Sequence, residues 1–188
     1  MKVIFLTHAE VIIDPDTPVP DWPLNDLGRA RHARFATDPA LQSVGTIFCS
    51  AERKARDAAE ITGAVLGVAP RIRPALGEND RSATGYLPGP EFEATADLFF
   101  ANPQDSIRGW ERAVDAQARI VTAVREALAE PRSEGDVLIV AHGGVATLLR
   151  CHLAGIPISR AQDQSGGGGN WYAFAPDMTS AATEWRAI

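Results

Sequence analysis

The sequence predicts an α/β domain with a mostly parallel central sheet. Three β-rich apolar runs each lead into a polar break and then a helix-like pattern: KVIFL, TIFCS and DVLIV, at residues 2–6, 46–50 and 136–140. Strands that alternate with helices in this way form βαβ units, which build parallel sheets. The length of 188 residues favours one domain over two. We therefore expect a single domain over residues 1–188.

The remaining elements follow from shorter patterns. RIR at 71–73 and NWYAFA at 170–175 predict two further strands. The segment 25–37 predicts a helix with Asn25 as its N-cap. Helical patterns also follow the second and third runs, at 51–61 and 141–150. The longest predicted helix covers 111–130, where Ala113, Val114, Val121, Val124 and Leu128 share one face.

Three segments lack a regular pattern. Residues 11–23 contain four prolines, and residues 74–93 are rich in Gly, Pro and polar residues. Long irregular segments in a compact domain are usually functional covers or disordered. We expect a loop-rich cover at about 74–110. The glycine run 166–169 is not followed by Lys-Ser or Lys-Thr, so it is no P-loop and predicts a flexible surface loop.

Composition excludes several classes of partner. The net charge of −6 argues against a broad nucleic-acid footprint. No apolar run approaches the length of a membrane span or a signal sequence. Cys49 and Cys151 are the only cysteines and form no CxxC motif, which favours a reducing cytoplasm. The scattered histidines and cysteines have no zinc spacing, and we expect no metal and no cofactor.

Polar residues stand where the three main strands end. His8, Ser50 and His142 each follow such an end. Because the carboxyl ends of parallel strands meet at one edge of a sheet, we expect the two histidines to converge there. Two imidazoles beside a cation and a carboxylate suit phosphoryl transfer. One imidazole can attack phosphorus, and an acid can protonate the leaving oxygen.

The order of five segments resembles the histidine phosphatase superfamily, the phosphoglycerate-mutase-like proteins. These segments are FLTHAE, WPLNDLGRARHA, FCSAERKARDAAEI, LGEND and VLIVAHGGVATLLR, which together run through most of the chain. The resemblance implies a three-layer sandwich with helices on both faces of the sheet. It also implies a phosphatase that acts on a small phosphorylated substrate. It does not indicate an oligomeric state.

The resemblance assigns roles residue by residue. His8 matches the phosphoacceptor and His142 the second catalytic histidine. Glu78 stands where the family keeps its acid/base. Gly143 opens the helix after His142, where backbone N–H groups can bind phosphate. Glu10 matches the glutamate of the first signature, with either a structural or a direct role.

Two positions depart from the family pattern. Thr7 replaces the arginine before the nucleophile, and Lys54 replaces the arginine of the second motif. We expect the Thr7 hydroxyl and the Lys54 ammonium to contact phosphate where the family uses two guanidinium groups. Arg and Lys are not equivalent at a bidentate phosphate site. Lys54 lies on the apolar face of its predicted helix, whereas Arg53 and Arg56 lie on a solvated face, so Lys54 is the expected phosphate ligand. Arg81 is the candidate that replaces the arginine lost at Thr7, unless it is merely solvated.

Other motifs carry no function in this reading. The Arg31–Ala33 segment imitates the first signature but lies inside a helical pattern. His152 follows an apolar helix and is interpreted as structural. Cys49 precedes a basic segment, but the arginine of a cysteine phosphatase would fall on Ala55. No G-x-S-x-G motif supports a serine hydrolase.

Two hypotheses therefore remain. The first is a phosphatase that hydrolyses a phosphomonoester through a phosphohistidine. The second is a catalytically weak or inactive protein of the same fold that binds a phosphorylated ligand or protein. Thr7 sustains the second hypothesis, whereas His8, Glu78 and His142 favour the first.

Overall fold

A six-stranded sheet forms the centre of the protein, whose computed structural model describes residues 1–188. The strand order is β3-β2-β4-β1-β5-β6. β4 lies between β1 and β2 and is parallel to both, and β3 extends the parallel part beside β2. β5 is antiparallel to β1, and β6 is antiparallel to β5. The strands are β1 Val3–Thr7, β2 Val44–Cys49, β3 Pro70–Ile72, β4 Asp136–Ala141, β5 Asn170–Phe174 and β6 Arg186–Ala187.

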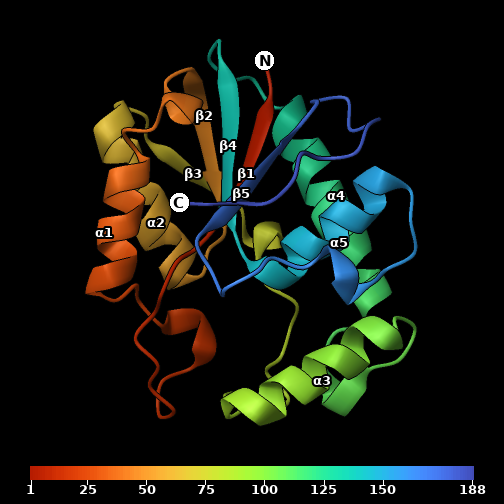
Figure 1. The fold of residues 1–188 in the computed structure, drawn as a ribbon. Helices are drawn as coiled ribbons and strands as arrows, with labels where there is room; N and C mark the ends of the chain where they lie inside the picture. The colour runs from red at the N-terminus through yellow and green to blue at the C-terminus, as the bar shows by residue number, and fades with distance from the viewer.

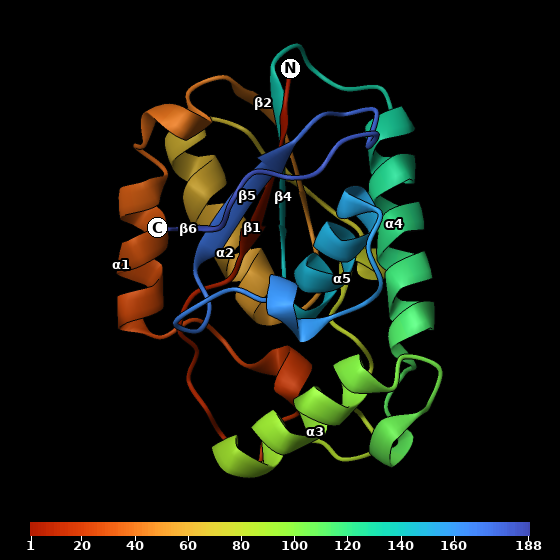
Figure 2. The same cartoon turned by 45° about the vertical axis from the view of Figure 1, so that its right-hand side comes forward.

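Helices cover both faces of this sheet, which confirms the predicted three-layer α/β class. α1 and α2 lie on one face, and α4 and α5 lie on the other (Figures 1 and 2). The helices are α1 Asp26–Phe35, α2 Arg53–Leu66, α3 Gly89–Ala101, α4 Ala113–Ala129 and α5 Gly143–Ala154. No helix has the length and apolar character that a membrane crossing requires.

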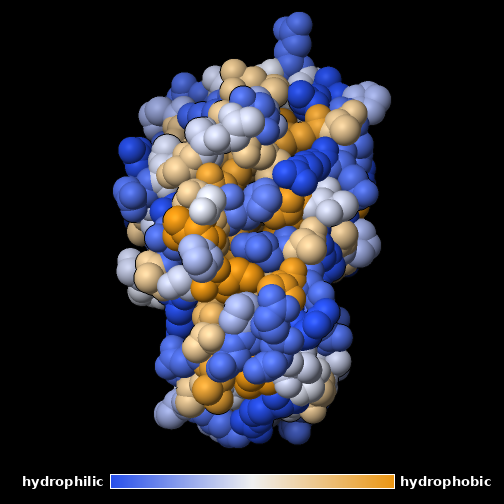
Figure 3. All heavy atoms as spheres, turned by 90° about the vertical axis from the view of Figure 1, so that its right-hand side faces the viewer, coloured by the Kyte–Doolittle hydropathy of each residue, from blue (hydrophilic) through white to orange (hydrophobic).

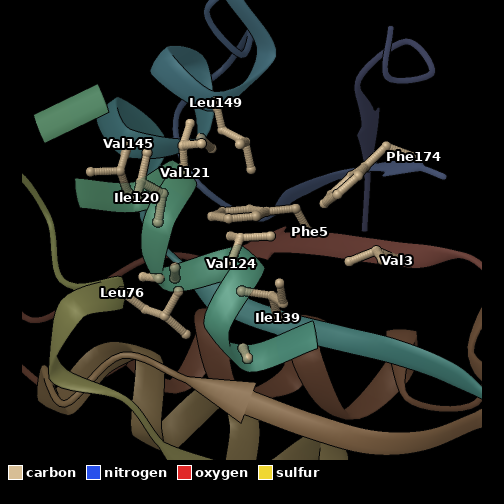
Figure 4. Packing of buried hydrophobic residues seen from close by; sticks show 14 of the residues in the cluster. Val3, Phe5, Leu76, Ile120, Val121, Val124, Ile139, Val145, Leu149 and Phe174 are labelled. Atoms are coloured by element: carbon tan, nitrogen blue, oxygen red, sulfur yellow. The ribbon is translucent and has the colours of Figure 1, made fainter. Parts of the chain in front are cut away.

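The side chains of β1 divide the core between the two faces. Val3 and Phe5 belong to the apolar cluster under α4 and α5, whereas Ile4 and Leu6 belong to the cluster under α1 and α2. This division follows from the two-residue period of a strand. Figure 4 shows Phe5 packed between Val124 and Leu149. Both faces of β1 are therefore buried, as expected for a strand inside a parallel sheet.

The five expected strands are present, with ends within about two residues of the predictions, as is usual for element boundaries. The Asn25 side chain caps α1 by accepting a hydrogen bond from the Gly28 N–H at 2.8 Å. β6 was not expected, and neither was α3, which lies inside the segment predicted to be loop-rich. The rest of that segment contains only short 3₁₀ turns at Pro74–Leu76 and Ile107–Gly109.

α3 lies beyond the end of the sheet that is opposite the N-terminus (Figures 1 and 2). Phe99 and Phe100 of α3 pack with Trp110 and with residues of α4 and α5 in a third apolar cluster. On the face that carries α4 and α5, hydrophobic residues lie in the middle of the main body down to the boundary with this lower part, with hydrophilic residues around them (Figure 3). The cluster fixes α3 beneath the carboxyl ends of β1 and β4.

Candidate active site

The sheet brings His8 and His142 together. β1 and β4 are neighbours, and the His8 N–H donates to the Ala141 carbonyl at 3.1 Å. The two imidazole rings lie 5.3 Å apart between centroids and meet edge to face at 66°. The predicted convergence at one sheet edge is therefore present in the structure.

The orientation of the His8 ring is fixed by its backbone neighbour. Its Nδ1 lies 2.8 Å from the Ala9 carbonyl oxygen, which accepts only if Nδ1 carries the proton. The lone pair then resides on Nε2. Burial and the nearby charge of Lys54 lower the pKa of His8 to about 4. The imidazole is thus neutral at pH 7 and can act as a nucleophile through Nε2.

His142 is fully buried and lies at the start of α5. Its Nε2 is 2.8 Å from Ser50 Oγ and 3.4 Å from Glu52 Oε1. Its Nδ1 is buried and has no hydrogen-bond partner within the protein. Burial lowers the pKa of His142 to about 3, against the opposing effect of the nearby carboxylates. Nδ1 is thus the one ring nitrogen of His142 that lacks a partner within the protein.

Glu52 is a member of this constellation that the sequence analysis missed. Its Oε2 lies 2.5 Å from Lys54 Nζ, and its Oε1 accepts the Glu78 N–H at 2.8 Å. Burial alone would raise the pKa of Glu52, but His142 and Lys54 outweigh it and lower the pKa to about 2. Glu52 is therefore a carboxylate at neutral pH, and it contacts Lys54, Glu78 and His142 at once.

Lys54 is 3% exposed, and its ammonium donates to the Val19 carbonyl at 2.8 Å as well as to Glu52. Arg53 and Arg56 are exposed, and Arg56 pairs with Glu60 at 3.9 Å. The lysine thus points toward the strand ends while the two arginines lie on the solvated face. Its charge, however, is already paired with that of Glu52.

The Glu78 carboxylate lies at the amino end of α5. Its Oε2 accepts the Gly144 N–H at 3.1 Å, and its Oε1 accepts the Val145 N–H at 3.0 Å. Gly143, Glu78 and His8 line the same cavity, which has a volume of about 450 Å³. A carboxylate that lines the same cavity as His8 can exchange protons with a group bound there.

Thr7 is 1% exposed and bonds to the C-terminal part of the chain. Its hydroxyl donates to Gln164 Oε1 at 2.8 Å and accepts the Asn170 N–H at 3.0 Å. The structure thus directs the Thr7 hydroxyl to the loop that precedes β5. Thr7 contacts no other residue of the predicted site through a hydrogen bond.

The glycine run contacts His8. The Gly169 N–H donates to the His8 carbonyl at 2.7 Å. A Cβ at Gly168 would lie 2.2 Å from that same oxygen, so only glycine fits there. The prediction of a flexible surface loop missed these contacts, because glycine at a close backbone approach leaves no signal in the apolar pattern.

Arg81 lines the His8 cavity, and its guanidinium stacks on Phe92 and Trp110 at 5.0 and 5.6 Å from their ring centroids. It forms no ion pair with an acidic side chain. Glu10 instead pairs with Arg31 at 2.6 Å, and Arg31 also binds two carbonyls of the glycine run. Glu10 therefore has a structural contact, one of the two roles considered for it.

The histidine and cysteines of the other motifs have structural positions. His32 is buried within α1, and its Nε2 accepts the Ala9 N–H at 3.0 Å. Cys49 and Cys151 are free and buried, and burial raises the pKa of Cys49 to about 11, which keeps it a thiol. No group of three or more His, Cys, Asp or Glu side chains is arranged to hold a metal ion.

The fold and the paired histidines define a protein of the histidine phosphatase type. The family model described as "Histidine phosphatase superfamily (branch 1)" matches residues 4–178. The chain therefore belongs to this superfamily, and membership assigns it to the phosphoric monoester hydrolases. No curated protein sequence matches the chain.

Solved structures share the fold at low sequence identity. The mycobacterial glucosyl-3-phosphoglycerate phosphatase in complex with inorganic phosphate is similar, with a TM-score of 0.75 and 23% identity over 98% of this chain and 94% of that chain. "Mycobacterial hydrolase 1" has a TM-score of 0.76 and 21% identity over 98% and 95%. TTHB049 from Thermus thermophilus has a TM-score of 0.71 and 21% sequence identity over the whole of both chains. At these identities the likeness establishes the fold.

Proposed function

We propose that the protein hydrolyses a small phosphomonoester through a phosphohistidine formed on His8. The supporting observation is the pairing of a neutral His8, held by the Ala9 carbonyl at 2.8 Å, with His142 at 5.3 Å between ring centroids. A fixed tautomer with a free Nε2 beside a second imidazole suits in-line attack on phosphorus. His8, His142 and Glu78 are the proposed catalytic residues.

The reaction has two steps. In the first, His8 Nε2 attacks phosphorus, the bond from phosphorus to the ester oxygen breaks, and the Glu78 carboxylic acid gives its proton to the leaving oxygen. In the second, water attacks the phosphohistidine while the Glu78 carboxylate takes its proton. The nitrogen–phosphorus bond then breaks, which releases inorganic phosphate and regenerates His8.

The phosphate ligands are the unpartnered Nδ1 of His142, the backbone of Gly143 and the cations Lys54 and Arg81. The buried Nδ1 of His142 has no hydrogen-bond partner within the protein, and a phosphate oxygen that contacts it would supply one. Arg81 supports this assignment because it lines the cavity and has no acidic partner. Thr7 then supports the loop before β5 instead of donating directly to phosphate.

The proposal extends to the domain organisation, the cellular compartment and the type of partner. The whole chain, 1–188, acts as one domain, and the segment 74–110 covers the site through α3, whose residues line the His8 cavity. The two buried free cysteines suit a reducing cytoplasm. The net charge of −6 suits a small substrate and disfavours nucleic acid.

One observation favours the alternative of a weak or inactive phosphate-binding protein. Glu52 neutralises Lys54, so the two positions where the family keeps arginine offer no free charge. The test is a phosphatase screen over a panel of phosphomonoesters, with a His8→Ala variant as control. Turnover by the wild type that disappears in the folded His8→Ala variant supports the phosphatase. Ligand binding by the wild type without turnover supports the phosphate-binding protein.

A further inference from the structure

A second cavity, with a volume of about 620 Å³, adjoins the one that contains His8. Its walls come from the proline-rich residues 15–20 on one side and from residues 78–86 on the other. Glu78, Asn79 and Arg81 line both cavities, so the two meet at these side chains. A phosphomonoester with its phosphorus at His8 can pass its ester oxygen by Glu78 and extend into the second cavity.

Asn79 lacks the partner that a buried amide needs. The residue is 7% exposed, and its Nδ2 has no hydrogen-bond partner. An unsatisfied buried donor costs about 1–3 kcal/mol, so native proteins seldom retain one without a purpose. Because this amide lies where the two cavities meet, a hydroxyl group of a bound ligand can accept its hydrogen bond.

The charges of the second cavity restrict what can enter. Glu52 is paired with Lys54, and Glu78 is held by the amino end of α5. Asp16 and Asp80 are the remaining carboxylates, and Arg81 is the only cation in the lining. The Ser82 N–H donates to Asp80 at 2.8 Å and lowers the pKa of that carboxyl, which keeps it ionised at neutral pH.

We propose that this cavity holds the leaving group and that it selects an uncharged, hydroxylated alcohol. Asp16 and Asp80 can accept hydrogen bonds from hydroxyls, Asn79 can donate one, and a leaving group that carries a carboxylate meets like charge. Tyr86, which lies 5.7 Å from Trp22 between ring centroids, adds an aromatic surface suited to the C–H face of a polyol. The inference rests on the proposed phosphatase function.

The experiment compares kcat/KM for three alkyl phosphomonoesters, glycerol phosphate, phosphoglycolate and phosphoethanolamine. The aryl ester nitrophenyl phosphate, which has no free hydroxyl, serves as the reference substrate. Glycerol phosphate should exceed phosphoglycolate by about tenfold or more, the size of one close like-charge contact. Asp16→Asn combined with Asp80→Asn should reduce the ratio of kcat/KM for glycerol phosphate to that for phosphoglycolate. Equal rates for the two substrates overturn the inference, and a preference for phosphoethanolamine overturns the requirement for an uncharged group.

Asn79→Ala tests the role of the Asn79 amide, which has no hydrogen-bond partner within the protein. The ratio of kcat/KM for glycerol phosphate to that for nitrophenyl phosphate, which has no free hydroxyl, should fall about tenfold, as for one lost hydrogen bond. Asn102→Ala, outside both cavities, is the matched control. If the alanine variant does not fold, Asn79→Leu keeps a similar size without the amide donor and should lower the ratio by a similar factor. An unchanged ratio overturns the role of Asn79.

Affinity separates this inference from the proposed reaction. Calorimetry measures binding of the same phosphomonoesters to the His8→Ala variant, in which no phosphohistidine can form. If nothing is hydrolysed but glycerol phosphate still binds about tenfold more tightly than phosphoglycolate, the hydrolase proposal fails and the leaving-group inference stands. Equal affinities contradict the inference whatever the activity.

Discussion

Lys54 and Glu52 form a buried ion pair, with 2.5 Å between Nζ and Oε2, beside the two histidines. Glu52 precedes the first residue of α2 and has an extended backbone, with φ −66° and ψ 141°. Its side chain therefore turns back onto Lys54, although residues two apart do not face each other on a helix. The pair places an internal carboxylate where the site would otherwise offer its buried cation to phosphate.

Glu52→Gln should strengthen phosphate binding. The substitution removes one negative charge, while the amide oxygen can still accept the Glu78 N–H. The inhibition constant of inorganic phosphate should fall at least about fivefold, because one charge contact at 4 Å is about 1 kcal/mol even in water. Glu60→Gln, exposed on α2, is the control. Weaker phosphate inhibition in a folded Glu52→Gln variant would show that Glu52 serves mainly to support His142.

Arg81→Gln should lower kcat/KM about a hundredfold, the usual effect of losing one donor to the transition state. Arg81→Lys keeps the charge and should recover part of this loss, whereas Arg53→Gln on the solvated face of α2 should have no effect. Melting temperatures must accompany these rates, because Arg81 stacks on Phe92 and Trp110. Wild-type kinetics in Arg81→Gln would exclude Arg81 as the cation that compensates for Thr7.

Thr7→Val should destabilise the protein. The change keeps the shape but leaves the buried Asn170 N–H without its acceptor, which costs about 1–3 kcal/mol. Thr7→Ser retains the hydroxyl and serves as the control. Chemical denaturation measures the free energy of unfolding. Unchanged stability in Thr7→Val would mean that the hydroxyl does not tie β1 to the loop before β5.

Acid should destabilise the protein through its buried histidines. Burial lowers the pKa of His32 to about 4. Between pH 6.5 and 4 the histidine is therefore protonated in the unfolded chain but not in the folded chain. Stability is therefore full above pH 6.5 and falls as the pH decreases, by about 1.4 kcal/mol per pH unit for one such histidine.

His32→Gln isolates this contribution. Glutamine can still accept the Ala9 N–H but does not titrate. The slope of the unfolding free energy against pH should therefore decrease by up to about 1.4 kcal/mol per pH unit, the contribution of one proton. His152→Gln is the comparison, because His152 is only partly buried and should change the slope less. Equal slopes for wild type and His32→Gln between pH 6.5 and 4 would contradict the assignment.

The parallel part of the fold was predictable because its strands are continuous apolar runs. α3 also had a signal, since Phe92, Ala96, Phe99 and Phe100 follow helical spacing, but the prolines and glycines around Pro90 obscured it. β6 spans two residues and carries no pattern that a strand prediction could use. Local composition thus favoured a loop where tertiary packing forms a helix.

The site was predictable where strand ends determine position. His8 and His142 follow neighbouring strands, so their convergence depends only on topology. Glu52 was missed because it falls inside the predicted helical pattern 51–61, whereas in the structure it precedes α2 with an extended backbone and turns back onto Lys54. The contacts of Thr7 and of the glycine run join residues more than 150 positions apart, and no local pattern encodes them.

The phosphorylation state of His8 during turnover tests the central claim most directly. Wild-type protein mixed with nitrophenyl phosphate and quenched in alkali should gain one phosphoryl group, acid-labile and mapped by mass spectrometry to the peptide that contains His8. The label should be absent from His8→Ala and should disappear once substrate is exhausted. Turnover by wild type with no labelled intermediate under rapid quenching, together with full activity in a folded His8→Ala variant, would contradict the account.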